Sequence, residues 1–360
     1  MSSEDDSQAM AQALQLAERG RTSTHPNPRV GCVIVREGVI VGQGYHERAG
    51  LPHAEVMALR DAGERARGAT VYVTLEPCCH TGRTPPCTDA LLAAGVGRVV
   101  VAMEDPDPRV AGGGVARLRA AGLAVDTGVM EAAARALNRG FISRLTRRRP
   151  FVRAKVGASL DGRTALTTGE SRWITSPEAR ADVQRLRAES SAIMTGIGTV
   201  MADNPALTVR PRPSRPPQRI IVDSRLRIAD EAAVLRPASE AIVATVADTG
   251  PRAEGLRAAG VRVVAAGSGE GGVDLAVLME KLAAMDINDL LVEAGPRLLA
   301  SLILKRLVDE LIVYMAPSLL GDGQPIAALR LACLAEQVRW RYVQVRQIGP
   351  DLRMVLSQVE

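Results

Sequence analysis

Histidine and cysteine are rare in this sequence, and they are concentrated near its beginning. All four histidines and four of the five cysteines lie in the first quarter of the 360-residue chain. His53-Ala54-Glu55 places an imidazole and a carboxylate on the expected first turn of one helix, and Cys78 and Cys87 follow. One imidazole and two thiolates are three ligands of a tetrahedral zinc ion, whose fourth position stays open for water in a catalytic site. The pattern predicts zinc-dependent hydrolytic chemistry in the first part of the chain.

The carboxylate of Glu55 makes this prediction more specific. Zinc lowers the pKa of a bound water to about 7. In zinc deaminases, a glutamate that is not a ligand carries protons from that water to the leaving ammonia. Cys87 comes just before a helix expected over residues 88–94, and a helix N-terminus stabilises a thiolate. We therefore predict a deaminase whose ligands are His53, Cys78 and Cys87, with Glu55 as its catalytic residue.

The residues alone leave alternatives open. A His-x-Glu triplet is common on surface helices, and the two cysteines are separated by a longer insert than the usual Pro-Cys-x-x-Cys pattern allows. Cys79 is an alternative ligand to Cys78, although Glu76-Pro77 favours Cys78. His80 is a possible fourth ligand of a purely structural site. The remaining cysteines, Cys32 and Cys333, are expected in the core.

The composition limits partners and location. The net charge of +5 is modest for this length and suits phosphorylated small molecules as well as nucleic acid. Aromatic residues make up only 2%, which disfavours an aromatic-lined path for a nucleic-acid strand. No apolar run reaches the roughly 18–20 residues of a membrane span, and the acidic N-terminus differs from a secretory signal. Five cysteines make no disulfide framework, which favours a reducing compartment. From these features together we expect a cytoplasmic protein with neither nucleic-acid nor membrane partners.

Apolar strands alternate with amphipathic helices along the chain, which predicts layered α/β sheets. A helix is expected over residues 54–67, where Gly68 would end it. The basic run Arg144–Pro150 is predicted to be a linker. It would separate a domain of residues 1–146 from one of residues 151–360.

The second half offers two turns that suit a phosphate. Gly196-Ile197-Gly198-Thr199 follows an expected strand but lacks the third glycine of a dinucleotide fingerprint. In Glu293-Ala294-Gly295-Pro296 a strand ends, a glycine permits close backbone approach, and a proline starts a helix. From its spacing alone, the second segment is more often a plain turn between strand and helix.

Read together, HAE…TLEPCCHTGRTPPC between His53 and Cys87 resembles the deaminase half of the bifunctional riboflavin-biosynthesis deaminase/reductase family. The insert between the cysteines is that family's own pattern, and the likeness continues through residues 25–33 and 104–112. The resemblance implies that Asn27 and His46 contact the pyrimidine and that His80 and Arg83 face the ribose phosphate. It assigns no role to Cys79.

Residues 155–164, 169–175 and 203–210, together with the Glu293 turn, resemble the reductase half of the same family. By this resemblance, NADPH would be bound by Gly157, Trp173, Thr199, Asp203, Ser224, Gly295, Pro296 and Arg297. The phosphorylated sugar would be held by Lys155, Ser171, Arg187, Leu207, Arg210 and Glu293. A lysine and two arginines would then surround one phosphate.

The resemblance implies a fold and two consecutive reactions. The first domain would be a cytidine-deaminase-like three-layer α/β/α domain with a mixed sheet, and the second a dihydrofolate-reductase-like α/β domain. With one zinc ion, the first would deaminate 2,5-diamino-6-ribosylamino-4(3H)-pyrimidinone 5′-phosphate. With NADPH, the second would reduce the ribosyl group to ribityl, in a homodimer formed through the reductase domain.

Two rival functions use the same residues. One is a nucleic-acid base deaminase, acting for example on tRNA, with an unrelated appended domain. The other is a non-catalytic, zinc-stabilised protein that binds a flavin precursor. A structural zinc site has no use for the Glu55 carboxylate, which argues against the second rival.

Overall fold

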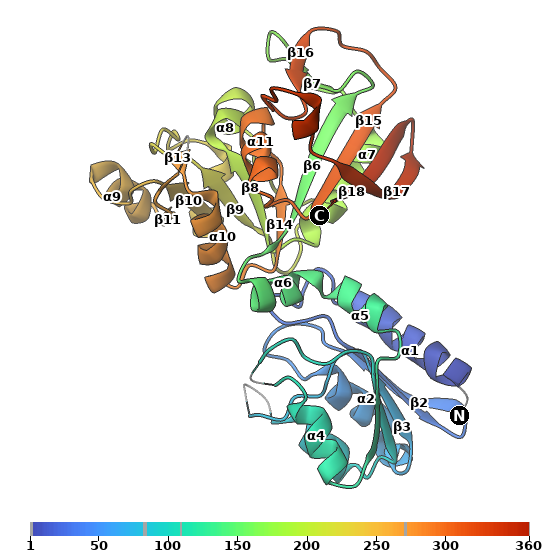
Figure 1. The fold of residues 1–360 in the computed structure, drawn as a ribbon. Helices are drawn as coiled ribbons and strands as arrows, with labels where there is room; N and C mark the ends of the chain where they lie inside the picture. The colour runs from blue at the N-terminus through green and yellow to red at the C-terminus, as the bar shows by residue number, and fades with distance from the viewer. Residues whose placement is uncertain (1–2, 82–84, 109, 270–271, 360) are drawn as a thin grey trace. The chain divides into compact units, whose positions relative to one another are not determined.

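The structure is a computed structural model that describes residues 3–81, 85–108, 110–269 and 272–359 (Figure 1). The chain divides into two compact units, Met1–Arg147 and Arg148–Glu360. Each unit contains its own sheet and its own buried apolar cluster. The predicted α/β class is confirmed. Within the described residues, no helix is both long and apolar enough to cross a membrane.

The first unit is built on a five-stranded mixed sheet in the order β2-β1-β3-β4-β5. Strand β1 pairs antiparallel with both of its neighbours, whereas β3, β4 and β5 run parallel. The strands are β1 (Gly31–Arg36), β2 (Val39–Tyr45), β3 (Thr70–Val73), β4 (Arg98–Val101) and β5 (Ala124–Thr127). The helices are α1 (Ser3–Glu18), α2 (Ala54–Ala62), α3 (Cys87–Ala93), α4 (Gly113–Ala120), α5 (Glu131–Leu137) and α6 (Arg139–Arg147).

Close packing between β2 and α2 fixes the helix that carries the His-Ala-Glu triplet. A Cβ atom on Gly44 of β2 would lie 2.6 Å from the carbonyl oxygen of Ala54 and 2.6 Å from the backbone nitrogen of Ala58. Only a glycine allows the strand and the helix to approach this closely. The start of α2, with His53 as its N-cap, is thereby held against the sheet.

Two local expectations were wrong, and a third segment differs only in its local structure. The helix predicted over residues 54–67 ends at Ala62, because Gly63 adopts φ +55° and a 3₁₀ turn follows. The boundary between the two units lies within the predicted linker Arg144–Pro150, which is helical as far as Arg147, at the end of α6. Arginines in the last turn of a helix interact favourably with its dipole, and Arg147 donates to the Ser143 hydroxyl at 2.7 Å. Cys333 is exposed beside a short 3₁₀ turn, whereas Cys32 is buried as expected.

The second unit contains a nine-stranded sheet in the order β11-β10-β9-β8-β14-β6-β15-β18-β17. The strands from β11 to β15 in this order run parallel, and β18 and β17 complete the sheet as an antiparallel hairpin. The strands are β6 (Phe151–Ser159), β8 (Ala192–Gly196), β9 (Gln218–Val222), β10 (Ala241–Thr245), β11 (Arg262–Ala265), β14 (Asp289–Val292), β15 (Glu310–Ala316), β17 (Trp340–Ile348) and β18 (Asp351–Gln358). Two small ribbons pair β7 (Arg163–Leu166) with β16 (Gly323–Pro325) and β12 (Ser268–Gly269) with β13 (Gly272–Val273).

Helices cover both faces of this sheet. Apolar side chains of α10 (Leu275–Ala284) and α11 (Pro296–Leu304) join one buried cluster, and those of α7 (Pro177–Ala188) and α9 (Pro251–Ala258) join the other. In β6, Val152, Ala154 and Val156 belong to the first cluster. Because side chains alternate along a strand, Lys155 and Gly157 face the side covered by α7.

The strand order reverses in the middle of the sheet. The chain starts at β6, moves outward through β8, β9, β10 and β11, and returns to place β14 between β8 and β6. In open parallel sheets, ligands bind beyond the carboxyl ends of the strands at such a reversal. The topology therefore predicts a ligand site at the carboxyl ends of β8, β14 and β6.

A buried carboxylate links α1 to the sheet of the first unit, and its removal should cost stability. Asp6 accepts hydrogen bonds from the Tyr72 hydroxyl at 2.7 Å and from two Arg98 nitrogens at 2.8 and 2.9 Å. The Arg98 hydrogen bonds hold the pKa of Asp6 below its ordinary value. We expect Asp6→Asn to lower the free energy of unfolding by about 1–3 kcal/mol at pH 7, since charged hydrogen-bonding partners are left buried.

The same contact predicts a pH dependence. A carboxyl whose pKa is depressed on folding stabilises above its unfolded pKa of about 3.9 and loses that contribution as pH falls through the folded pKa. Denaturant unfolding of the wild type and Asp6→Asn should therefore differ at pH 7 and converge below about pH 4. A difference that stays constant down to pH 3 would contradict an ionic role for Asp6.

Candidate functional site

The His-Ala-Glu helix, the segment after β3 and the start of α3 bring three ligand atoms together. His53 Nδ1 lies 3.6 Å from Cys78 Sγ and 3.3 Å from Cys87 Sγ, and the three ligand atoms lie within 4.8 Å of one another. Zinc bond lengths of 2.3 Å to sulfur and about 2.0 Å to nitrogen place tetrahedral ligands about 3.5 Å apart. The donor set and its spacing thus fit a zinc ion.

The neighbouring donors take other positions. Cys79 Sγ lies next to Gly113, because a Cβ atom added to Gly113 would be 3.1 Å from it. The Cys79 carbonyl accepts a hydrogen bond from Arg117 at 3.2 Å. His80 is exposed in the insert between Cys78 and Cys87. Arg83, in the same insert, lies outside the described residues.

Hydrogen bonds around the two thiols favour ionisation of Cys78. The Cys87 side chain bonds to Cys78 and, together with His53 and the Cys87 backbone N–H at 3.3 Å, lowers the pKa of Cys78 to about 4. Cys87 is the first residue of α3, where free helix N–H groups favour negative charge. The site is therefore prepared for a cation.

Glu55 lies beside this cluster on the first turn of α2 and is only 3% exposed. Burial raises the pKa of its carboxyl, and the positive charge of His53 acts in the opposite direction. A carboxylate whose pKa moves toward neutrality is well suited to take up and return a proton.

Asn27 and His46 adjoin the same cluster. His46 Nδ1 lies 3.2 Å from the Pro52 carbonyl, so Nδ1 donates there and Nε2 accepts from the Asn27 amide at 3.0 Å. The His46 ring meets the His53 ring edge to face, with centroids 5.3 Å apart. Burial lowers the pKa of His46, which favours the neutral ring that this hydrogen-bond pattern requires.

In the second unit, a charged cluster lies at the reversal of strand order. Val292 pairs with Ala154, so Glu293 follows β14 next to Lys155 on β6. From α7, Arg187 binds the Glu293 carboxylate with both Nε and Nη2, at 2.6 and 2.9 Å. Although burial acts to raise it, the charge of Arg187 holds the pKa of Glu293 below its ordinary value. Burial lowers the pKa of the Lys155 ammonium.

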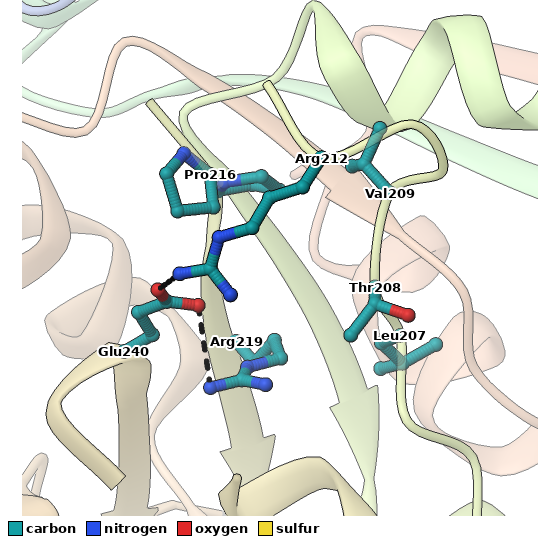
Figure 2. A pocket seen from close by; sticks show the side chains of 8 residues that line it. Leu207, Thr208, Val209, Arg212, Pro216, Arg219 and Glu240 are labelled. Atoms are coloured by element: carbon teal, nitrogen blue, oxygen red, sulfur yellow. Dashed lines mark hydrogen bonds and ion pairs between the residues drawn. The ribbon is translucent and has the colours of Figure 1, made fainter. Parts of the chain in front are cut away.

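Arg187 also connects this cluster to the loop after α8 (Ile197–Asp203). Its Nη1 donates to the Thr208 carbonyl at 3.1 Å, next to Leu207, whose φ is +49°. Thr208 and Leu207 also line a cavity of about 220 Å³, in which Arg212 and Arg219 both extend toward Glu240 (Figure 2). Arg187 thus forms hydrogen bonds with both Glu293 and Thr208. The sequence indicated neither contact.

The other two residues expected at the sugar lie on neighbouring loops. Arg210 is exposed, and its backbone N–H donates to the Gln184 side chain of α7 at 3.0 Å. Ser171 is half-buried on the loop that leads from β7 to α7.

Several of the residues expected at NADPH follow the carboxyl ends of the adjacent parallel strands β9, β8 and β14. After β8, the Thr199 hydroxyl accepts from the Gly295 N–H at 3.1 Å, which joins this turn to the one after β14. Gly295 is the N-cap of α11, Pro296 is its first residue, and Arg297 is exposed. Figure 1 shows α8 and α11 next to each other. An N-cap without a side chain leaves helix N–H groups for a phosphate, which fits a dinucleotide.

Three further positions border these turns. Ser224 follows β9, and its hydroxyl accepts from the Val273 N–H at 3.1 Å. Gly157 lies on β6, where a Cβ would come 3.2 Å from Thr175 Cγ2. The carbonyl of Asp203, at the end of α8, accepts from Arg172 at 2.8 Å, next to Trp173. Trp173 is 69% exposed, and the Arg180 guanidinium lies 4.4 Å from its ring centroid.

Sequence reasoning missed Thr175 and Thr208. Thr175 packs where Gly157 lacks a side chain, and Thr208 supplies the carbonyl that Arg187 binds. Both lie within segments 169–175 and 203–210, which the sequence had singled out. Nothing in those segments indicated a contact with Gly157 or Arg187.

Comparison with known families and proteins agrees with this arrangement. Residues 3–103 match the model of the cytidine and deoxycytidylate deaminase zinc-binding region, and residues 150–354 match that of the RibD C-terminal domain. The riboflavin biosynthesis protein RibD of Escherichia coli is 51% identical, covering 96% of this chain and 98% of its relative. That of Aquifex aeolicus is 45% identical, covering 97% of each.

Solved structures agree over the whole chain. The Acinetobacter baumannii RibD structure superposes with a TM-score of 0.93 at 43% identity and covers 100% of both chains. A diaminohydroxyphosphoribosylaminopyrimidine deaminase/5-amino-6-(5-phosphoribosylamino)uracil reductase from Thermotoga maritima superposes with a TM-score of 0.88 at 32% identity and covers 99% of both. The chain therefore belongs to the RibD family, whose members combine a zinc-dependent pyrimidine deaminase and a reductase of riboflavin biosynthesis in one polypeptide.

Proposed function

We propose that the two compact units divide the family's two reactions between them, with deamination in residues 1–146 and reduction in residues 151–360. The chain is a bifunctional deaminase and reductase that uses zinc and NADPH. The division is supported by the positions of the two polar clusters, which lie in different units. The observation that carries the deaminase assignment is the buried Glu55 beside His53, Cys78 and Cys87.

In the first unit, His53, Cys78 and Cys87 would hold the metal. A bound zinc ion supplies a Lewis acid that makes water a nucleophile near neutral pH. Glu55 takes the proton of the attacking water and delivers it to the departing amino group, which leaves as ammonia. Its burial keeps bulk water from competing for that proton.

The remaining deaminase residues would orient the substrate. His46 is fixed by Pro52 and in turn fixes the Asn27 amide, so that a polar edge is presented to the pyrimidine. His80 and, by resemblance, Arg83 would bind the ribose phosphate from the insert between the cysteines. The substrate proposed here is 2,5-diamino-6-ribosylamino-4(3H)-pyrimidinone 5′-phosphate.

In the second unit, the sugar would be held by the six residues Lys155, Ser171, Arg187, Leu207, Arg210 and Glu293. Arg187 keeps Glu293 ionised and oriented, and Lys155 stands beside Glu293 as a hydrogen-bond donor for the sugar oxygen on which charge develops. NADPH, when bound, supplies the hydride. It would be bound by Gly157, Trp173, Thr199, Asp203, Ser224, Gly295, Pro296 and Arg297.

The two rival functions have less support. A nucleic-acid base deaminase with an unrelated appended domain does not explain matches to RibD proteins that cover nearly the whole chain. A non-catalytic zinc protein gives no use to the buried Glu55 carboxyl. We accordingly propose small-molecule substrates without a nucleic-acid partner, and a cytoplasmic location in which the five cysteines stay reduced.

The homodimer is proposed to form through the β17–β18 hairpin of the reductase unit. The edge strand β17 carries apolar side chains that are unusually open, with Tyr342 62%, Val343 58% and Val345 53% exposed. An exposed apolar edge strand favours pairing with another chain. Asp182 of α7 holds this hairpin through Arg346 at 3.3 Å and Arg353 at 3.1 Å, so its surface is formed before association.

Replacing Glu55 tests the deaminase. Glu55→Gln should reduce ammonia release by about 10²–10⁴-fold, because the amide cannot carry the proton. Zinc content should be unchanged, since Glu55 is not a ligand. NADPH oxidation with the deaminated substrate should also be unchanged, as should both activities in the exposed control Glu131→Gln. Wild-type ammonia release from Glu55→Gln, or comparable release from tRNA, would refute the assignment.

Replacing Lys155 tests the reductase. Lys155→Met keeps an unbranched chain but removes the ammonium, so kcat/KM for NADPH-dependent reduction should fall by about 10²-fold or more. Ammonia release should be unaffected, because it depends on the other unit. The matched control Lys305→Met changes an exposed lysine after α11 and should retain reduction. Equal reduction rates in the two variants would exclude Lys155 from the site.

Introducing positive charge at the apolar edge strand tests the dimer. The double variant Tyr342→Lys/Val343→Lys should sediment as a monomer at concentrations where the wild type is a dimer, because two lysines per chain would oppose each other at the interface. The control Val39→Lys alters a residue of the first unit with the same 62% exposure as Tyr342 and should remain dimeric. A monomeric wild type, or a dimeric double variant, would disprove this interface.

A further inference from the structure

A buried carboxylate two residues before Cys78 has no part in the mechanism above. Glu76 is 3% exposed and follows β3. Its Oε2 accepts from the backbone N–H groups of Asp105 and Gly112, each at 3.0 Å, and its Oε1 accepts from that of Val115 at 2.9 Å. Charge-assisted bonds of this kind are about twice as strong as neutral ones. Glu76 therefore ties the residues around the start of α4 to the cysteine segment.

These bonds replace a cap that α4 does not supply for itself. The N-cap residue is Gly112, at φ +73°, and it has no side chain to accept from the free N–H groups of the first turn. An aspartate or serine at the N-cap commonly fills that role, and negative charge is stabilised there by the helix dipole. Glu76 performs it from a segment 36 residues away in the sequence.

The start of α4 also packs tightly on the residues that flank Cys78. A Cβ on Gly114 would lie 2.0 Å from the Pro77 carbonyl oxygen, so the two backbones are in direct contact. Arg117 donates to the Cys79 carbonyl at 3.2 Å. On its other side, Cys78 is held by α3, where the Thr88 N–H donates to the Cys78 carbonyl at 3.2 Å. Cys78 thus lies between two helix starts.

We propose that Glu76 is a positioning residue for the metal centre. By capping α4 from outside, it holds the backbone of the cysteine segment so that Cys78 Sγ stays at ligand distance from His53 and Cys87. It touches neither substrate nor metal and acts through Cys78. The inference rests on the proposed zinc ligands and adds a residue that sets their geometry. Changing groups that orient metal ligands typically costs 10–100-fold in metal affinity or activity.

The variant Glu76→Gln tests this role in the full chain. It keeps the size of the side chain but replaces one accepting oxygen by an amide that cannot accept from a backbone N–H. Zinc release to a chromogenic chelator should be about 10–100-fold faster than in the wild type, with a parallel loss of ammonia release. NADPH oxidation by the other unit should not change. The control Glu131→Gln removes an exposed carboxylate paired with Arg135 and should release zinc at the wild-type rate.

Each outcome separates this inference from the ligand assignment. If the wild type holds no zinc, the proposed ligands are wrong. If the wild type holds zinc and Glu76→Gln releases it at the same rate, Glu76 does not position the centre. A purely structural role would lower the unfolding temperature of the zinc-free variant while leaving zinc release from the folded variant unchanged.

A milder variant covers the case in which Glu76→Gln does not fold. Arg117→Gln removes the contact with the Cys79 carbonyl and the ion pair with Asp89 at 2.6 Å, but leaves the carboxylate in place. It should accelerate zinc release in the same direction by a smaller factor. An unchanged rate in Arg117→Gln would overturn the proposal that the start of α4 positions Cys78.

Discussion

The deaminase unit depends on one constraint, which is that two thiols and an imidazole from distant segments must remain within a few ångströms of one another. Helix starts satisfy this constraint. His53 is the N-cap of α2, Cys87 is the first residue of α3, and Cys78 is bonded to the start of α3. A free N–H group at the start of α3 donates to Cys78 Sγ, so the Cys78 thiolate is stabilised where the metal is required. The mixed sheet fixes the position of α2, because Gly44 of β2 packs directly against the helix backbone.

The reductase unit meets a different constraint with a related solution. Its polar residues lie at the carboxyl ends of parallel strands, where the strand order reverses and backbone groups are free for ligands. Burying the Glu293 carboxylate would be costly without hydrogen-bond donors, and Arg187 supplies two. The same arginine holds the loop of Thr208, so one guanidinium connects α7, β14 and the loop after α8.

Buried carboxylates recur in both units as links between elements. Asp6 joins α1 to β3 and β4, Glu76 joins the cysteine segment to α4, and Asp182 joins α7 to β15 and to the terminal hairpin. Each accepts several charged or backbone donors, which compensates the loss of hydration. These links explain how a chain with 2% aromatic residues, and a core mostly of alanine, valine, leucine and isoleucine, positions two sites.

The sequence by itself determined the chemistry available and most of the elements, because residue types and short-range periodicity are local properties. Histidine and cysteine placement indicated the metal centre, and alternating strands and helices indicated the α/β class. Local signals placed the end of α2 at Gly68 instead of Gly63, and they missed the helix that runs to Arg147. Only the tertiary structure placed the Cys79 thiol beside Gly113, paired Arg187 with Glu293, and brought Glu76 to a helix that lies more than 30 residues further along. Those outcomes depend on which distant segments meet, and no local pattern encodes the direction in which a side chain finally points.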